Sequence, residues 1–182
     1  MTRRAFLISC LGGSGLVLTA GIFQNLPPKE LKGRLSIDAV LKVCDSLKVN
    51  PLAIETTGVW SANQIFTHCA QSIELSFSGF PVHKGELFKA VLGKTAFGFF
   101  AARGKLTHKL SEQIPGLDEV PSSNKASTIK DSIERLTSAF KKLGAASENL
   151  QEHFAYGPLS VRQHNMAHIL HFYNHLDEIN FA

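Results

Sequence analysis

Residues 160–179 read SVRQHNMAHILHFYNHLDEI, and this stretch decides much of what the chain can fold into. Ser160 and Gln163 have the spacing of a helix capping box, and Gly157 with Pro158 provides a turn just before it. The stretch is therefore predicted to be an α-helix that begins at a well-marked residue.

Four histidines follow one side of this predicted helix: His164, His168, His171 and His175. At about 100° per residue they fall within roughly 60° of arc, beside an apolar arc that would face a core. Imidazoles at i and i+4 lie above one another, so two of their nitrogens can point at one metal ion. Spacing alone leaves open whether the pair is His164/His168, His168/His171 or His171/His175.

The rest of the chain also has helical patterns. Apolar residues recur at helical spacing in four further segments, residues 37–47, 62–77, 86–102 and 129–150. Residues 104–126 show no sustained period and contain Pro115-Gly116, which predicts a long loop of the kind that is usually functional or mobile. No stretch alternates like a β-strand. The sequence therefore predicts an all-α fold, a bundle of about four main helices.

Composition describes an ordinary globular domain. The chain has 182 residues, of which 44% are hydrophobic and 19% charged, with a formal net charge of +4. Leaving out Arg3 and Arg4 reduces the 19 basic residues to 17, against 15 acidic ones. No basic stripe is interleaved with aromatic residues, so a nucleic-acid partner is not expected.

The first residues have the layout of an export signal. Residues 2–7, TRRAFL, resemble the twin-arginine motif, an apolar run follows, and no acidic residue appears before Glu30. We predict that residues 1–26 are a twin-arginine signal peptide, or a membrane anchor through residues 5–23. The domain of residues 33–182 would then be exported by the twin-arginine machinery to the periplasm or cell envelope.

Two cysteines remain outside the leader, Cys44 and Cys69. An envelope location permits a disulfide between them, and two buried free thiols are the favoured alternative. Cys69 follows His68 and would point about 100° away from it on a helix, so we expect Cys69 in the core rather than at a metal.

Several ordered blocks are similar to one branch of the DinB-like superfamily. They are THCAQSIELSFSGFP from Thr67, GKTAFGFFAARGKLTHKL from Gly93, HFAYGPLS from His153 and HILHFYNHLDEI from His168, and the similarity covers residues 60–179. This bacterial branch has no known function and often carries a twin-arginine leader. The resemblance implies a DinB-like four-helix bundle, with an N-terminal signal or anchor helix before it. It also implies a three-histidine metal site, with one ligand on the second helix and an H-x-x-x-H pair on the last. The matching residues here are His68, His171 and His175.

The resemblance also implies a chemistry. Three imidazoles with open positions suit a divalent transition metal such as zinc, nickel or iron. The superfamily includes metal-dependent thiol transferases, which implies an enzyme of transferase or hydrolase type with a small, thiol-containing substrate and no assignable catalytic residue. The alternative is a non-catalytic envelope protein that binds a metal or ligand or senses pH. The oligomeric state, including a homodimer, stays open.

The remaining polar candidates have weaker assignments. His168 is predicted to lie behind the ligands or in a cavity wall, and His164 to face solvent. Glu178, one turn beyond the last histidine, either accepts the outer N–H of a ligand or, as we favour, is a surface carboxylate. His108 and His153 are predicted to be ordinary loop residues, although either could reach a pocket mouth.

Overall fold

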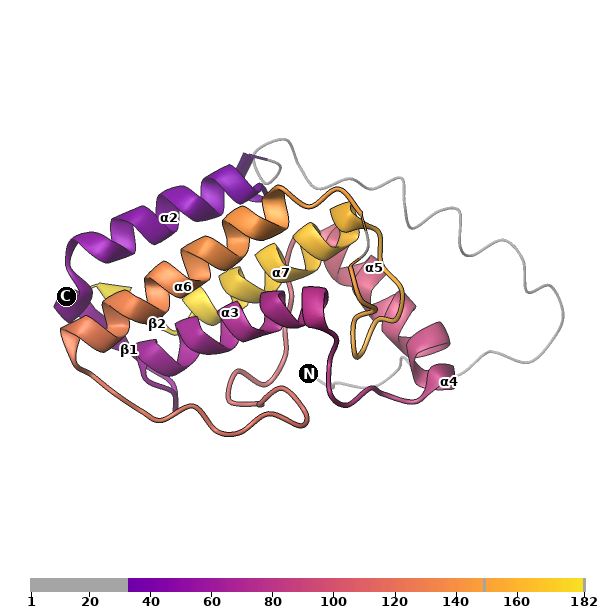
Figure 1. Cartoon of the computed structure of the whole chain (residues 1–182), viewed down its shortest axis with the longest axis horizontal. Helices are drawn as coiled ribbons and strands as arrows, with labels where there is room; N and C mark the ends of the chain where they lie inside the picture. The colour runs from indigo at the N-terminus through magenta and orange to yellow at the C-terminus, as the bar shows by residue number, and fades with distance from the viewer. Residues whose placement is uncertain (1–32, 149, 182) are drawn as a thin grey trace, which may run out of the picture.

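The structure is a computed structural model and describes residues 33–148 and 150–181. It is mostly helical, which confirms the all-α class. The four long helices are α2 (Ile37–Val49), α3 (Ala62–Ser78), α6 (Ala126–Gly144) and α7 (Val161–Leu176). They run alongside one another in Figure 1, and α6 packs against both α2 and α3.

A second helical segment connects α3 to the long loop and lies at one end of the molecule (Figure 1). It consists of α4 (Glu86–Phe88), a π turn η2 (Lys89–Gly93) and α5 (Lys94–Arg103). Residues 104–125 then form no helix or strand, as predicted. The π turn was not predicted, because the apolar pattern of residues 86–102 indicated only helix in general.

Two short strands correct the expectation that the chain has none. After η1 (Pro51–Ala53), β1 (Ile54–Thr56) pairs antiparallel with β2 (Ile179–Phe181), with Thr56 opposite Ile179. Three residues are too few to show alternation, and the partner strand lies at the far end of the described chain. The predicted helix over 160–179 ends earlier for the same reason, since its last residue belongs to β2.

The start of α7 is where the sequence predicts it, and the bounds of α6 differ from the prediction. The capping box of α7 forms as predicted: the Gln163 side chain accepts from the Ser160 amide at 2.8 Å, and Ser160 Oγ accepts from the Gln163 amide at 3.3 Å. The predicted helix over 129–150 instead runs from Ala126 to Gly144. The chain beyond it therefore turns back toward α7 earlier than expected.

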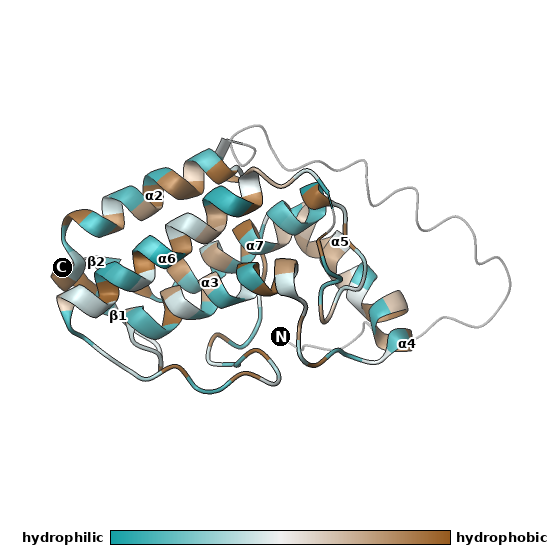
Figure 2. Cartoon of the chain, viewed as in Figure 1, coloured by the Kyte–Doolittle hydropathy of each residue, from teal (hydrophilic) through white to brown (hydrophobic). Residues whose placement is uncertain are grey.

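The core lies between the four long helices and consists mainly of aliphatic and aromatic side chains. Brown apolar positions alternate with teal polar ones along each helix in Figure 2, as expected for helices that bury one side. The largest fully buried aromatics are Phe66, Phe140 and Phe172. Cys44 and Cys69 are buried here as free thiols, and burial raises the pKa of Cys44 to about 11 and that of Cys69 further. Both thiols therefore remain protonated at neutral pH.

The predicted signal peptide or anchor, residues 1–26, lies outside the described residues. Among the described residues, none of the helices is long and apolar enough to cross a membrane.

Candidate metal centre

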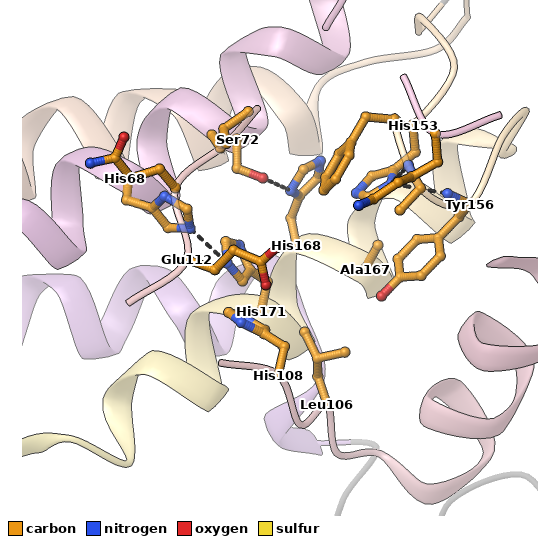
Figure 3. A pocket seen from close by; sticks show the side chains of 15 residues that line it. His68, Ser72, Leu106, His108, Glu112, His153, Tyr156, Ala167, His168 and His171 are labelled. Atoms are coloured by element: carbon orange, nitrogen blue, oxygen red, sulfur yellow. Dashed lines mark hydrogen bonds between the residues drawn. The ribbon is translucent and has the colours of Figure 1, made fainter. Parts of the chain in front are cut away.

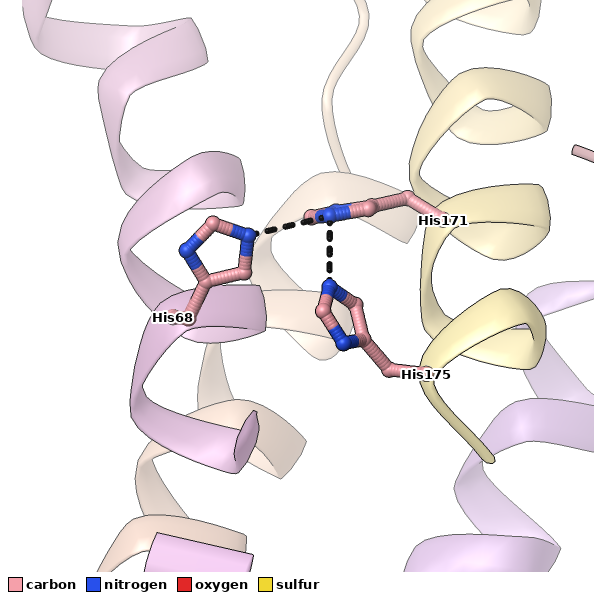
Figure 4. A group of neighbouring side chains, drawn as sticks. All are labelled: His68, His171 and His175. Atoms are coloured by element: carbon pink, nitrogen blue, oxygen red, sulfur yellow. Dashed lines mark hydrogen bonds between the residues drawn. The ribbon is translucent and has the colours of Figure 1, made fainter. Parts of the chain in front are cut away.

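Three histidines from two neighbouring helices converge on one point. His68 projects from α3, and His171 and His175 project from consecutive turns of α7 (Figure 4). His171 Nε2 lies 3.1 Å from His68 Nε2 and 3.1 Å from His175 Nε2. The ligand atoms of all three lie within 4.8 Å of one another. The structure thus brings together the three residues that the DinB-like resemblance implied.

The nitrogen spacing fits ligands better than a hydrogen-bonded chain. Nitrogens bound to one ion at about 2.0–2.1 Å in tetrahedral geometry lie about 3.3–3.4 Å apart. A single imidazole nitrogen has one proton or one lone pair, so His171 Nε2 cannot satisfy both neighbours by hydrogen bonding alone. These three residues can hold a metal ion.

Burial keeps all three imidazoles neutral. Loss of solvation lowers the pKa of His68 to about 4, with a further contribution from His108. Burial lowers the pKa of His175 to about 2, and that of His171 lies well below its usual range because of burial and then repulsion from His175. A neutral imidazole is the form that binds a metal, so the site is in binding form at neutral pH.

Trp60 closes the inner side of the cluster. It stands just before the start of α3 and stacks on His175, with ring centroids 5.8 Å apart and planes 9° from parallel. Its ring also packs against His68 at 4.9 Å. Trp60 is itself buried, so it shields this side of the site from solvent. This role could not be predicted, because a lone tryptophan before a helix has no metal-site signature.

The outer nitrogen of one ligand has no partner. His175 Nδ1 is buried and makes no hydrogen bond within residues 33–148 and 150–181. Glu178 does not fill this role: its carboxylate lies against Gly58, at a place where a β-carbon on that glycine would clash. The structure therefore gives Glu178 no role at the metal, as in the favoured interpretation, but its side chain is half-buried and not a fully exposed surface carboxylate.

A cavity of about 320 Å³ opens beside the cluster, and His68 and His171 form part of its wall (Figure 3). Its apolar walls include Leu106, Ile114 and Ala167, while Lys84 and Glu112 bring opposite charges to its exposed rim. A pocket of this size with apolar walls and a few convergent polar groups is typical of a small-molecule site. The candidate metal centre is therefore open on one side.

His168 lies in the cavity wall, as predicted. Its Nε2 is 2.7 Å from Ser76 Oγ and its Nδ1 is 3.4 Å from Ser72 Oγ, so both nitrogens are engaged with α3. Burial holds its pKa well below the usual range. These contacts fix the neighbouring turn of α7 against α3.

His164 does not face solvent, which corrects the prediction. It is fully buried and stacks near His168, with ring centroids 6.0 Å apart. Burial lowers its pKa, partly opposed by the backbone of Gln151, but neither ring nitrogen makes a well-formed hydrogen bond within the described chain. The first turn of α7 is covered because the chain after α6 folds back there, with the Gln151 amide bonded to Ser76 at 2.7 Å.

Both loop histidines reach the cavity, contrary to the favoured interpretation. His153 is buried, its Nδ1 accepts from the amides of Ala155 and Tyr156 at 3.2 and 3.3 Å, and burial lowers its pKa to about 3. The Tyr156 ring stacks on it, with centroids 4.4 Å apart. His108 approaches from the long loop, with its ring 5.0 Å from that of His171. The unusual length of that loop was the one sequence signal for its involvement.

Comparison with known proteins yields one match. The family model described as "Protein of unknown function (DUF1569)" matches residues 29–181. No curated protein and no solved structure matches the chain. Since the match covers well over half of the chain, including every residue of the candidate metal centre, the protein belongs to the DUF1569 family.

Proposed function

We propose that this protein is an exported, DinB-like metalloprotein in which His68, His171 and His175 bind one divalent transition ion, zinc, nickel or iron. The observation that carries the proposal is the convergence of the Nε2 atoms of two buried histidines and one half-buried histidine beside an open cavity. The four long helices that hold them support a four-helix bundle of the DinB-like kind.

The arrangement suits catalysis of transferase or hydrolase type. A bound ion of this kind lowers the pKa of a water or thiol and so supplies a nucleophile near neutral pH. The chain's own contribution is to exclude water behind the site with Trp60 and to leave the opposite side open to the cavity. A small molecule would bind there, and the resemblance favours one that contains a thiol.

The alternative of a pH-sensing protein is not favoured. Burial lowers the pKa values of His68, His153 and His175 to about 4, 3 and 2, so these groups do not change charge near neutral pH. A non-catalytic metal-binding protein would bind the same ion, but its metal-loaded form would not turn over a substrate.

The metal content of protein purified from cells tests the proposal. Wild-type protein should contain about one divalent transition ion per chain by elemental mass spectrometry. His171→Ala should lose nearly all of it, because two imidazoles on different helices make a labile site. His83→Ala, which changes an exposed histidine paired with Glu152, should retain it. Equal metal in His171→Ala and wild type would refute the three-histidine site.

A further inference from the structure

The long loop brings a fourth imidazole to the candidate metal centre. The His108 ring lies 5.0 Å from that of His171 and 5.2 Å from that of His175. Its backbone N–H donates to Asn174 Oδ1 at 3.2 Å, and Asn174 stands directly before His175 on α7. The loop is thus tied to the same helix that carries two of the ligands.

The hydrogen bonds of His108 define what its free nitrogen can do. Nδ1 lies 2.9 Å from the Lys109 carbonyl, which can only accept, so the ring proton of neutral His108 is assigned to Nδ1. Nε2 then carries a lone pair. That atom is buried, and no donor reaches it within the described parts of the chain. A buried acceptor without a partner is costly, so a partner is expected from outside the chain.

His108 stands next to the three ligands and not among them. The nitrogens of His68, His171 and His175 form a group within 4.8 Å of one another, and His108 is not part of that group. It does line the cavity onto which the cluster opens (Figure 3). Its lone pair therefore lies at the cavity side of the site, where it can accept a hydrogen bond from whatever occupies the cavity.

We propose that His108 Nε2 accepts a hydrogen bond from the molecule at the open side of the site, and so selects ligands with a protic group, such as a hydroxyl, amine or thiol. A ligand that offers only lone pairs would face the lone pair of His108 and bind less well. The inference rests on the proposed metal site and adds the class of group that the site accepts.

The test uses the full folded protein loaded with Co²⁺, whose visible absorption reports changes at the ion, together with azide as a ligand without a proton to donate. His108→Leu keeps much of the side-chain bulk and removes the lone pair. It should bind azide at least about tenfold more tightly than wild type, with the Kd for Co²⁺ changed by less than about tenfold. Unchanged azide affinity would overturn the proposal. A loss of Co²⁺ as severe as in His171→Ala would also overturn it, by making His108 a ligand.

A second measurement needs no substitution. In ¹⁵N-histidine-labelled protein, Zn²⁺ should move the Nε2 resonances of His68, His171 and His175 to metal-bound positions, while His108 Nε2 keeps the shift of an uncoordinated acceptor. Movement of His108 with the other three would contradict the proposal. If wild-type protein takes up neither ion, the proposed function fails as well. Metal uptake without the azide effect refutes only the role of His108.

Discussion

At the scale of single residues, the role of each histidine depends on the partners of its two ring nitrogens. His168 has a serine hydroxyl at each nitrogen, His171 has two other imidazoles, and His164 has nothing of good geometry within the described chain. These three histidines, which follow one side of the same helix, therefore have different roles.

His164 can be replaced with an apolar residue of similar size. His164→Leu removes two buried nitrogens that lack partners and keeps most of the packing, so we expect the free energy of unfolding to rise by about 1 kcal/mol. Metal content should be unchanged, because His164 is not part of the ligand group. Urea denaturation and elemental analysis check both expectations, with His164→Ala as the cavity-forming control that should be less stable yet still load metal. Loss of the ion from His164→Leu would place the site nearer the start of α7.

Residue-level prediction from sequence succeeded where the determining partner is on the same element. The i, i+4 relation of His171 and His175 follows from helix geometry alone, and the resemblance supplied His68. The burial of His164 could not be predicted, because residues 151–157 cover it and their path depends on tertiary packing. Trp60 was missed and His108 was not favoured for the same reason: each reaches the site from a segment without periodicity.

At the scale of elements, the π turn η2 is packed against the turn that carries His153. Gly93 lies so close to the Ala155 carbonyl that a β-carbon there would clash with backbone atoms. The buried Lys89 amine is bonded to Glu152 across the same contact. These two contacts hold the turn of residues 153–157 over the cavity.

Gly93→Ala should therefore disturb this turn more than a glycine substitution normally does. We expect a loss of about 1–3 kcal/mol in the free energy of unfolding, since the neighbouring atoms are backbone and cannot rotate away. Gly33→Ala, where a β-carbon meets nothing within 4 Å, is the matched control and should change little. Thermal and urea denaturation of both variants measure the difference. A Gly93→Ala protein as stable as the control would show that η2 and the turn can separate freely.

The longer helices could be predicted from the sequence, and the short strands could not. Periodicity located α2, α3, α6 and α7, because each buries one face over three or more turns. It could not locate β1 and β2. Each strand has only three residues and is stabilised by pairing with the other. Periodicity also placed the end of α6 too late. The residues after Gly144 have a composition that suits a helix, but they are not helical.

At the scale of the whole molecule, several buried neutral histidines make stability depend on pH. The unfolded chain takes up a proton at each near pH 6.5, whereas burial lowers the folded pKa of His68 to about 4 and of His153 to about 3. Between these values the unfolded state binds more protons, so the free energy of unfolding falls as pH falls, by up to about 1.4 kcal/mol per pH unit for each histidine.

Metal-free protein should accordingly lose stability steeply from about pH 6.5 toward pH 4 and show little change above it. Urea denaturation in a chelator at fixed ionic strength measures this profile. His153→Gln should reduce the pH dependence of the free energy of unfolding by the contribution of one histidine, provided that the variant folds at neutral pH. A profile that is level from pH 7 to pH 5 would mean that these imidazoles are solvated in the folded state.

The proposed export would depend on residues 1–26, which lie outside the described structure. If residues 1–26 are a twin-arginine signal, changing Arg3 and Arg4 together to Lys should leave the protein in the cytoplasm, because that route reads the paired guanidinium groups. Cell fractionation of tagged protein measures the distribution, and Lys29→Arg with Lys32→Arg, outside the motif, is the control. Normal export of the double-lysine variant would indicate another route.

The distance along the chain between His68 and His171, 103 residues, has a consequence for the order of folding. Contacts that close so long a loop cost much chain entropy and tend to form after local ones, and the β1–β2 pairing spans a longer segment still. We therefore expect the site to assemble after the rate-limiting barrier, so that an ion slows unfolding but does not speed folding. Stopped-flow refolding with and without Zn²⁺ would reveal it, and faster refolding with the ion would mean that the ion acts as an early nucleus.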